Sequence, residues 1–281
     1  MPNPRNIDAP VTLIANGRSG TSLIQSIFSH HPAFDCCGET AAMVFGVWHS
    51  TERLKGIVRP DRNLGATPDF ELRCGKAVRA VMLDTFRAGN KRFWMHKPIG
   101  VPWVWQTLGK QGMSEAERVK WYWQVMAVSF PESQNITVLR HPYDVVISAV
   151  NYWNITPQQA WSSVVRMARI LGHRDANITY AVNYSQLVKE PLAETERMFE
   201  AIGRPFNPLC LKAFESIWVP DMETRKAAYS AANPRVDDRF SRQKEWSQLA
   251  GEDFSEAERN TICSMWRRYG VELVLKSPCS L

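Results

Sequence analysis

The segment from Val11 to Glu39 constrains the fold of this chain more than any other. A β-branched run at residues 11–14 predicts a buried strand, and apolar residues at 23, 24, 27 and 28 predict a helix directly after it. Between them lies the turn Gly17-Arg18-Ser19-Gly20-Thr21-Ser22. Glycines let a backbone approach a ligand closely, and the first N–H groups of a helix attract anions. The segment therefore predicts a cradle for a phosphate or sulfate ester, with Arg18 as a fixed cation beside it.

This turn departs from the loop of ordinary nucleotide triphosphatases. It lacks the Gly-Lys pair of the pattern G-x-x-x-x-G-K-[ST], and Arg18 stands before the second glycine. The lysine and the hydroxyl of that pattern serve Mg²⁺-bound triphosphates, so an ATPase or an ordinary kinase is disfavoured. A plain strand-to-helix connection without a ligand remains the structural alternative.

A second anion-binding pattern lies more than a hundred residues further on. Residues 135–139 predict a strand, which is followed by Arg140-His141-Pro142-Tyr143-Asp144 and a helix that contains Ser148. An arginine at a strand end can make paired charge-assisted bonds to a phosphate, and a serine hydroxyl can add a donor. The alternative is an arginine at the sheet edge and a serine buried in a helix.

The two patterns together resemble those of the PAPS-dependent sulfotransferases (PAPS is 3′-phosphoadenosine-5′-phosphosulfate). The arginine in the first loop is similar to the protein-tyrosine and bacterial branch of that family. The resemblance implies that residues 17–22, including Arg18, Ser19, Gly20, Thr21 and Ser22, bind the 5′-phosphosulfate. It also implies that Arg140 and Ser148 bind the 3′-phosphate.

Further cofactor-binding residues follow from the same resemblance. Tyr184-Ser185-Gln186-Leu187 partly matches the family's Tyr-Glu-x-Leu segment, in which the tyrosine contacts the adenine side of the nucleotide. Core packing is the alternative for Tyr184. In this family the segment at 220–248 supplies cations to the 3′-phosphate, and Arg239, Arg242 and Lys244 are the candidates.

The resemblance also suggests catalytic residues, with Arg18 among them. Glu39 in Cys-Gly-Glu-Thr matches the position of the base in the tyrosine enzymes, although a helix-capping turn explains it equally well. His96 and Lys97 follow a strand predicted at 91–95, where the family places a catalytic histidine or lysine. Arg18 and Lys97 would neutralise the leaving phosphate, and either Glu39 or His96 would take the acceptor proton.

Strands that alternate with helices predict an α/β fold: a three-layer P-loop-type parallel sheet flanked by helices, with helical insertions. We expect a single domain over residues 1–281 and four strands, with 34–40 as a short link and 51–73 as a polar surface excursion. The two anion sites should then meet at the carboxyl edge of the sheet.

Composition narrows the choice of partners. The excess of 34 Lys and Arg over 28 acids suits an anionic co-substrate, but no concentrated basic tract indicates nucleic-acid binding. No apolar run reaches the ~18 residues of a membrane span, and the N-terminus lacks a signal segment, so we expect a cytoplasmic protein. The six cysteines have no metal-like spacing, and no metal is expected. The oligomeric state, a homodimer among the options, is left open.

The sequence thus predicts an enzyme that moves a sulfuryl group from PAPS to a hydroxyl or amine and leaves PAP, the 3′,5′-bisphosphate. The acceptor, whether a small molecule, a carbohydrate or a peptide, is not identified. One alternative is a P-loop kinase-like phosphotransferase, but none of the four predicted strands ends in the Asp that its metal needs. The other is a non-catalytic module that binds nucleotide or sulfated glycan.

Overall fold

A computed structural model describes residues 9–54, 69–86, 91–100, 105–215 and 243–278 of the chain. The chain divides into two compact units. The first comprises residues 1–13 and 33–134, and the second comprises residues 14–32 and 135–281. Each unit is described by itself below, and the expectation of a single domain stays a prediction.

Five parallel strands form one sheet in the order β2-β3-β1-β4-β5, and helices flank it. In the first unit Val11 of β1 pairs with Met95 of β3, and Phe34 of β2 pairs with Phe93 of β3. In the second unit Ile136 of β4 pairs with Tyr180 of β5. The predicted α/β class with a parallel sheet is therefore confirmed.

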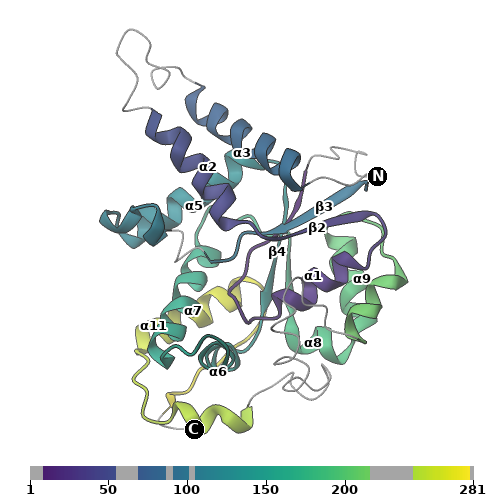
Figure 1. Cartoon of the computed structure of the whole chain (residues 1–281). Coiled ribbons are helices and arrows are strands. Elements are labelled where there is room, and N and C mark those ends of the chain that lie inside the picture. The colour runs from purple at the N-terminus through teal and green to yellow at the C-terminus, as the bar shows by residue number, and fades with distance from the viewer. Residues whose placement is uncertain (1–8, 55–68, 87–90, 101–104, 216–242, 279–281) are drawn as a thin grey trace. The chain divides into compact units, whose positions relative to one another are not determined.

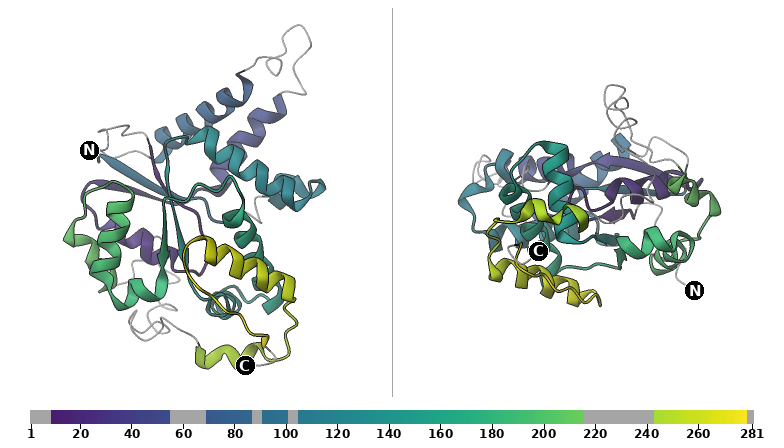
Figure 2. Two further views of the ribbon diagram at one scale, coloured as in Figure 1. Left: turned by 180° about the vertical axis from the view of Figure 1, so that it is seen from behind. Right: turned by 90° about the horizontal axis from the view of Figure 1, so that it is seen from below.

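The first unit holds three strands and the helices that pack on one another beside them. Its elements are β1 (Val11–Leu13), β2 (Phe34–Glu39), α2 (Ala41–Arg53), α3 (Phe70–Phe86), β3 (Phe93–Lys97), η4 (Lys110–Gly112) and α5 (Glu115–Ser129). Helix α3 packs against both α2 and α5, and α2 and α3 lie side by side (Figure 1; Figure 2, left). Buried aromatic side chains fill the core between them, among them Phe45, Trp48 and Tyr122.

The second unit carries both predicted anion-binding patterns. Its elements are α1 (Thr21–Ser29), β4 (Gln134–Leu139), α6 (Pro142–Trp153), α7 (Pro157–Gly172), β5 (Tyr180–Asn183), α8 (Tyr184–Lys189), α9 (Pro191–Ala201), η5 (Pro208–Phe214), η7 (Gln243–Leu249) and α11 (Glu256–Arg268). Helix α7 packs against α6 and α11, and η7 packs against α6. Arg268 of α11 donates to the carbonyl oxygens of Gly172 and His173, which satisfies the carboxyl end of α7.

Local sequence signals account for several helix starts. Ser114 begins α5 with a capping box, in which its hydroxyl accepts from the Glu117 N–H and the Glu117 carboxylate accepts from the Ser114 N–H. Thr156 begins α7 in the same way with Gln159. Each box satisfies two N–H groups that a helix leaves without internal partners, so Ser114 and Thr156 are favourable helix starts.

The structure corrects three local expectations. Residues 34–39 are not a link but an edge strand, β2, so the sheet has five strands rather than four. Both ends of the segment predicted as an excursion at 51–73 are helical, because α2 extends to Arg53 and α3 begins at Phe70, while 55–68 lie outside the described residues. Strand β3 spans Phe93–Lys97 and not 91–95, so His96 and Lys97 belong to the strand and do not follow it. The sequence 34–39 escaped detection because Asp35, Gly38 and Glu39 interrupt the apolar run that marks a buried strand.

Candidate functional site

The loop after β1 contains two residues whose backbone lies in the left-handed region. Gly20 is the N-cap of α1 at φ 108°, and Arg18 also lies in the left-handed region at φ 69°. A Cβ on Gly20 would lie 2.5 Å from the Tyr184 ring, and one on Gly17 would lie 2.5 Å from the Trp153 indole. Each glycine thus accommodates the close approach of an aromatic ring, and Gly20 is also favoured by its positive φ.

The amino end of α1 has the properties expected of an anion cradle. No side chain caps it, and its first turn, opened by Thr21 and Ser22, contains no acidic residue. The hydroxyl of the buried Ser19 donates to the Asn16 carbonyl at 2.7 Å, so this hydrogen bond stabilises the loop and does not cap the helix. The positive end of the helix dipole thus lies beside Arg18, and the first turn of α1 supplies no acidic residue to offset it.

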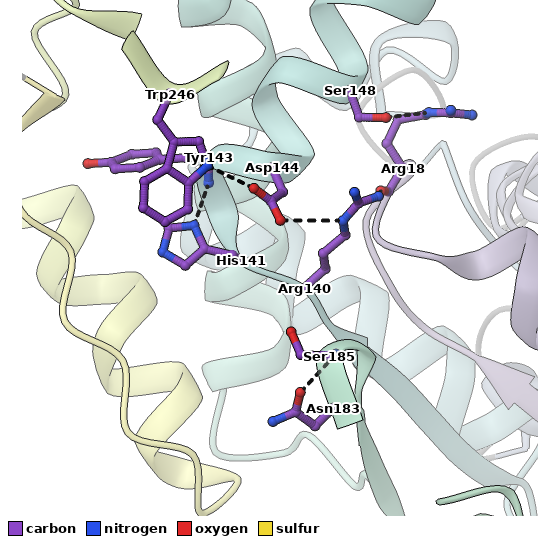
Figure 3. Close-up of polar contacts among 9 residues, drawn as sticks. All are labelled: Arg18, Arg140, His141, Tyr143, Asp144, Ser148, Asn183, Ser185 and Trp246. Atoms are coloured by element: carbon purple, nitrogen blue, oxygen red, sulfur yellow. Dashed lines mark hydrogen bonds and ion pairs between the residues drawn. The ribbon is translucent and has the colours of Figure 1, made fainter. Parts of the chain in front are cut away.

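The two predicted anion sites lie in contact within the second unit (Figure 3). Arg18 Nε donates to Ser148 Oγ at 3.2 Å, and Arg140 Nη1 donates to the Arg18 carbonyl at 3.3 Å. The guanidinium of Arg18 also lies 4.0 Å from the centroid of the Tyr152 ring. Ser148 and Tyr152 are four residues apart on α6, so they share a helix face. Arg18, Arg140 and Ser148, which are separated by up to 130 positions, therefore form one cluster.

Tyr184 lies in the same cluster, in contact with Gly20 and Arg140. Its ring is buried, packs against Gly20 and lies 4.7 Å from the guanidinium carbon of Arg140. Arg239 and Arg242 lie outside the described residues. Lys244 belongs to η7, but the position of its side chain is not described. The role of these four residues toward a nucleotide stays a prediction.

In the first unit, Glu39 and Lys97 lie opposite each other where two strands end. The pairing of β2 with β3 shifts between Cys36 and Glu39, and this irregularity places Glu39 beside Lys97. The Lys97 ammonium lies 3.9 Å from Glu39 Oε1, with side-chain exposures of 8% and 65% respectively. The carboxylate of Glu39 is thus accessible to a ligand, while the Lys97 ammonium beside it is buried.

His96 has an environment unlike that of Glu39. Its side chain is completely buried and packs against the rings of Trp94 and Phe130. Burial lowers the pKa of His96 from 6.5 to about 3, so the ring is neutral. Both ring nitrogens are engaged, Nε2 with Thr12 Oγ1 at 2.8 Å and Nδ1 with Thr40 Oγ1 at 2.9 Å.

The tautomer of His96 follows from the donors and acceptors in the series of buried hydrogen bonds that links Pro10, Ser133, Thr12, His96 and Thr40. Ser133 donates to the Pro10 carbonyl, so Thr12 must donate to Ser133, and His96 Nε2–H must donate to Thr12. Nδ1 is then the acceptor and Thr40 the donor. Only this arrangement satisfies all four contacts. Thr40 is also the N-cap of α2, yet its side chain makes no capping bond, because its hydroxyl is turned to His96.

Sequence reasoning did not identify Thr12, Thr40, Tyr152 or Trp153 as neighbours of the candidate site residues. Thr40 stands next to Glu39 and could be read as an N-cap, but nothing in the sequence indicates a bond to His96. Tyr152 could have been found, since it lies one helical turn after Ser148. Trp153 is 45% exposed and covers Gly17, a contact that only the tertiary structure shows.

The residues that the structure describes contain neither a group of three or more His, Cys, Asp or Glu that could hold a metal ion nor a helix long and apolar enough to span a membrane. These findings concern the described ranges alone.

Comparisons with known proteins identify similar sequences and structures. A family model described as "Sulfotransferase family" matches residues 10–208. The sulfotransferase domain of the Synechococcus PCC 7002 olefin synthase is similar at a TM-score of 0.58 and 16% identity, over 94% of this chain and 96% of that one. A sulfotransferase domain from the curacin biosynthetic pathway is similar at 0.54 and 14%, over 95% and 99%. No curated protein sequence matches this chain.

Proposed function

This chain belongs to the sulfotransferase family, and we propose that it moves a sulfuryl group from PAPS to a hydroxyl or amine of an acceptor. One observation supports the proposal most. Arg140 and Ser148, the residues proposed for the 3′-phosphate, both contact Arg18 of the loop proposed for the 5′-phosphosulfate. A nucleotide with anionic groups at both ends could therefore be bound by a single cluster.

The residues of the second unit would hold the nucleotide. The N–H groups at the start of α1 and the Arg18 guanidinium suit the 5′ end, and the Arg140 guanidinium with the Ser148 hydroxyl suits the 3′-phosphate. Because Arg18 Nε donates to Ser148 here, a bound nucleotide would compete with this bond for both groups. Charged donors of this kind stabilise negative charge that develops on a leaving phosphate.

We propose Glu39 as the general base. The acceptor oxygen or nitrogen forms a bond to sulfur, the bond between sulfur and the phosphate oxygen breaks, and the acceptor proton passes to the Glu39 carboxylate. The exposure of the Glu39 carboxylate, which makes it accessible to an acceptor, supports this role. His96 is a weaker candidate, since it is buried, neutral, and engaged at both nitrogens. Its bond to Thr40, the residue after Glu39, suggests that it positions the base instead.

Calorimetric titration with PAP tests the donor. We expect the protein to bind PAP without added metal and more tightly than ATP with Mg²⁺. The kinase-like alternative predicts the opposite order. A panel of small-molecule, carbohydrate and peptide acceptors with ³⁵S-labelled PAPS then tests transfer. Tight binding of PAP without transfer to any acceptor would favour a non-catalytic binding module.

Substitution of Glu39 by glutamine tests the base. General acid–base catalysis contributes about 10²- to 10⁴-fold, so Glu39→Gln should lower the transfer rate by about that factor and leave PAP affinity within about twofold. Glu52→Gln is the matched control, because Glu52 is also paired with a lysine of the first unit, Lys110, at 3.0 Å. Equal rates in the wild type and Glu39→Gln would remove Glu39 from the mechanism.

A further inference from the structure

Trp246 in η7 covers the start of α6, about one hundred residues earlier in the chain (Figure 3). Its indole stacks on the His141 ring with centroids 4.1 Å apart and meets the Tyr143 ring edge-on at 5.6 Å. Its Nε1–H donates to Asp144 Oδ1 at 2.8 Å. The stacking requires only an aromatic ring, whereas the hydrogen bond requires the indole N–H. The bond and the packing can therefore be separated by substitution.

Asp144 connects Trp246 to Arg140. The Asp144 side chain is 2% exposed, and its Oδ2 lies 3.9 Å from Arg140 Nε while Oδ1 accepts from Trp246. A buried carboxylate is stable only when donors or cations satisfy its oxygens. Among its contacts, Oδ1 has the indole N–H as a donor at hydrogen-bond distance, while the 3.9 Å between Oδ2 and Arg140 Nε is longer than a direct hydrogen bond.

Arg140 is also held on other sides. Its Nη1 donates to the Arg18 carbonyl, and the Tyr184 ring lies 4.7 Å from its guanidinium carbon. Asp144 supplies the nearby negative charge among these contacts. If Oδ1 lost the indole donor, the buried carboxylate would gain by moving toward Arg140 and forming a closer ion pair. A guanidinium drawn into that pair has fewer donors available for a ligand phosphate.

We propose that Trp246 is a positioning residue for the 3′-phosphate of the nucleotide, and that it acts by holding Asp144 away from Arg140. This inference rests on the proposed function. It predicts a specific loss, confined to ligands that carry a 3′-phosphate. A merely structural role of Trp246 would weaken all adenine nucleotides together.

Trp246→Phe keeps a ring on His141 and removes the donor to Asp144. We titrate each protein with PAP and with adenosine 5′-phosphate, which lacks the 3′-phosphate, by calorimetry. Loss of one charge-assisted hydrogen bond corresponds to about a tenfold effect. We expect Trp246→Phe to bind PAP about tenfold more weakly and adenosine 5′-phosphate within about twofold of the wild type.

Trp161→Phe is the matched control. Trp161 Nε1 donates to Glu258 Oε2 at 2.9 Å in the same unit, so the same substitution removes an equivalent bond to a carboxylate. We expect it to leave the ratio of the two affinities unchanged. Should Trp246→Phe fail to fold, β-(3-benzothienyl)alanine at position 246 keeps the shape of the indole and lacks its N–H.

The outcomes are distinguishable. An unchanged ratio of affinities in Trp246→Phe, or equal weakening of both ligands, overturns the positioning role while the proposed function stands. A wild-type protein that binds PAP no better than adenosine 5′-phosphate removes the 3′-phosphate site itself, and with it both proposals. A loss restricted to PAP supports the inference.

Discussion

The free energy of unfolding of this protein should fall at acidic pH, because burial lowers the pKa of His96. The pKa of His96 is about 3 in the folded chain, against 6.5 for an ordinary histidine. Between these values the unfolded chain binds a proton that the folded chain does not, so the free energy of unfolding falls as the pH falls. One full pH unit in this range corresponds to about 1.36 kcal/mol. Because only half of the unfolded chains carry this proton at pH 6.5, the loss per pH unit is smaller there, and the expected loss from pH 6.5 to 4.5 is about 2.3 kcal/mol.

The measurement compares the wild type with His96→Asn. Urea unfolding followed by tryptophan fluorescence gives the free energy of unfolding of each protein at pH 6.5 and at pH 4.5. His96→Asn cannot take up the proton, so its loss over this range should be smaller by about 2.3 kcal/mol. His141, whose pKa burial lowers to about 4, is present in both proteins and cancels in the difference.

Equal losses in the two proteins would refute this reasoning. Nitrogen-15 NMR of the wild-type imidazoles gives an independent test if His96→Asn does not fold. We expect one ring to remain neutral and protonated at Nε2 down to about pH 4, as the hydrogen-bonded chain from Thr40 to Pro10 requires. A folded-state titration of His96 near pH 6.5, or protonation at Nδ1, would show that the ring is free to act as a base.

Two further predictions concern the cluster formed by the glycine loop, Arg140 and Tyr184. Gly20→Ala should lower the free energy of unfolding by more than about 1 kcal/mol, because φ is 108° and the new Cβ would lie 2.5 Å from the Tyr184 ring. Gly46→Ala, on open space in α2, should raise it by about 0.5–1 kcal/mol, and thermal unfolding compares the two. Arg140→Ala should weaken PAP binding about 10- to 150-fold by calorimetry, and unchanged affinity would remove Arg140 from the site.

Much of the fold was accessible from the sequence because its signals are local. The strand, the glycine turn and the helix at residues 11–29 follow from periodicity and turn chemistry, and the structure has all three. The starts of α5 and α7 follow from capping residues. Strand β2 was missed because an edge strand with polar positions lacks the apolar run by which a buried strand is recognised.

The sequence by itself determined which residue types are available for the chemistry: a glycine turn with Arg18, the Arg140 and Ser148 pair, Glu39, and Lys97 after a predicted strand. Only the tertiary structure decided which of these residues are in contact and which are buried. It placed Arg18 against Ser148, buried His96 between two threonines, and brought Trp246 to Asp144. The physical reason is that burial and hydrogen bonding set the charge and the free donors of a side chain. Both depend on neighbours that are distant in the chain.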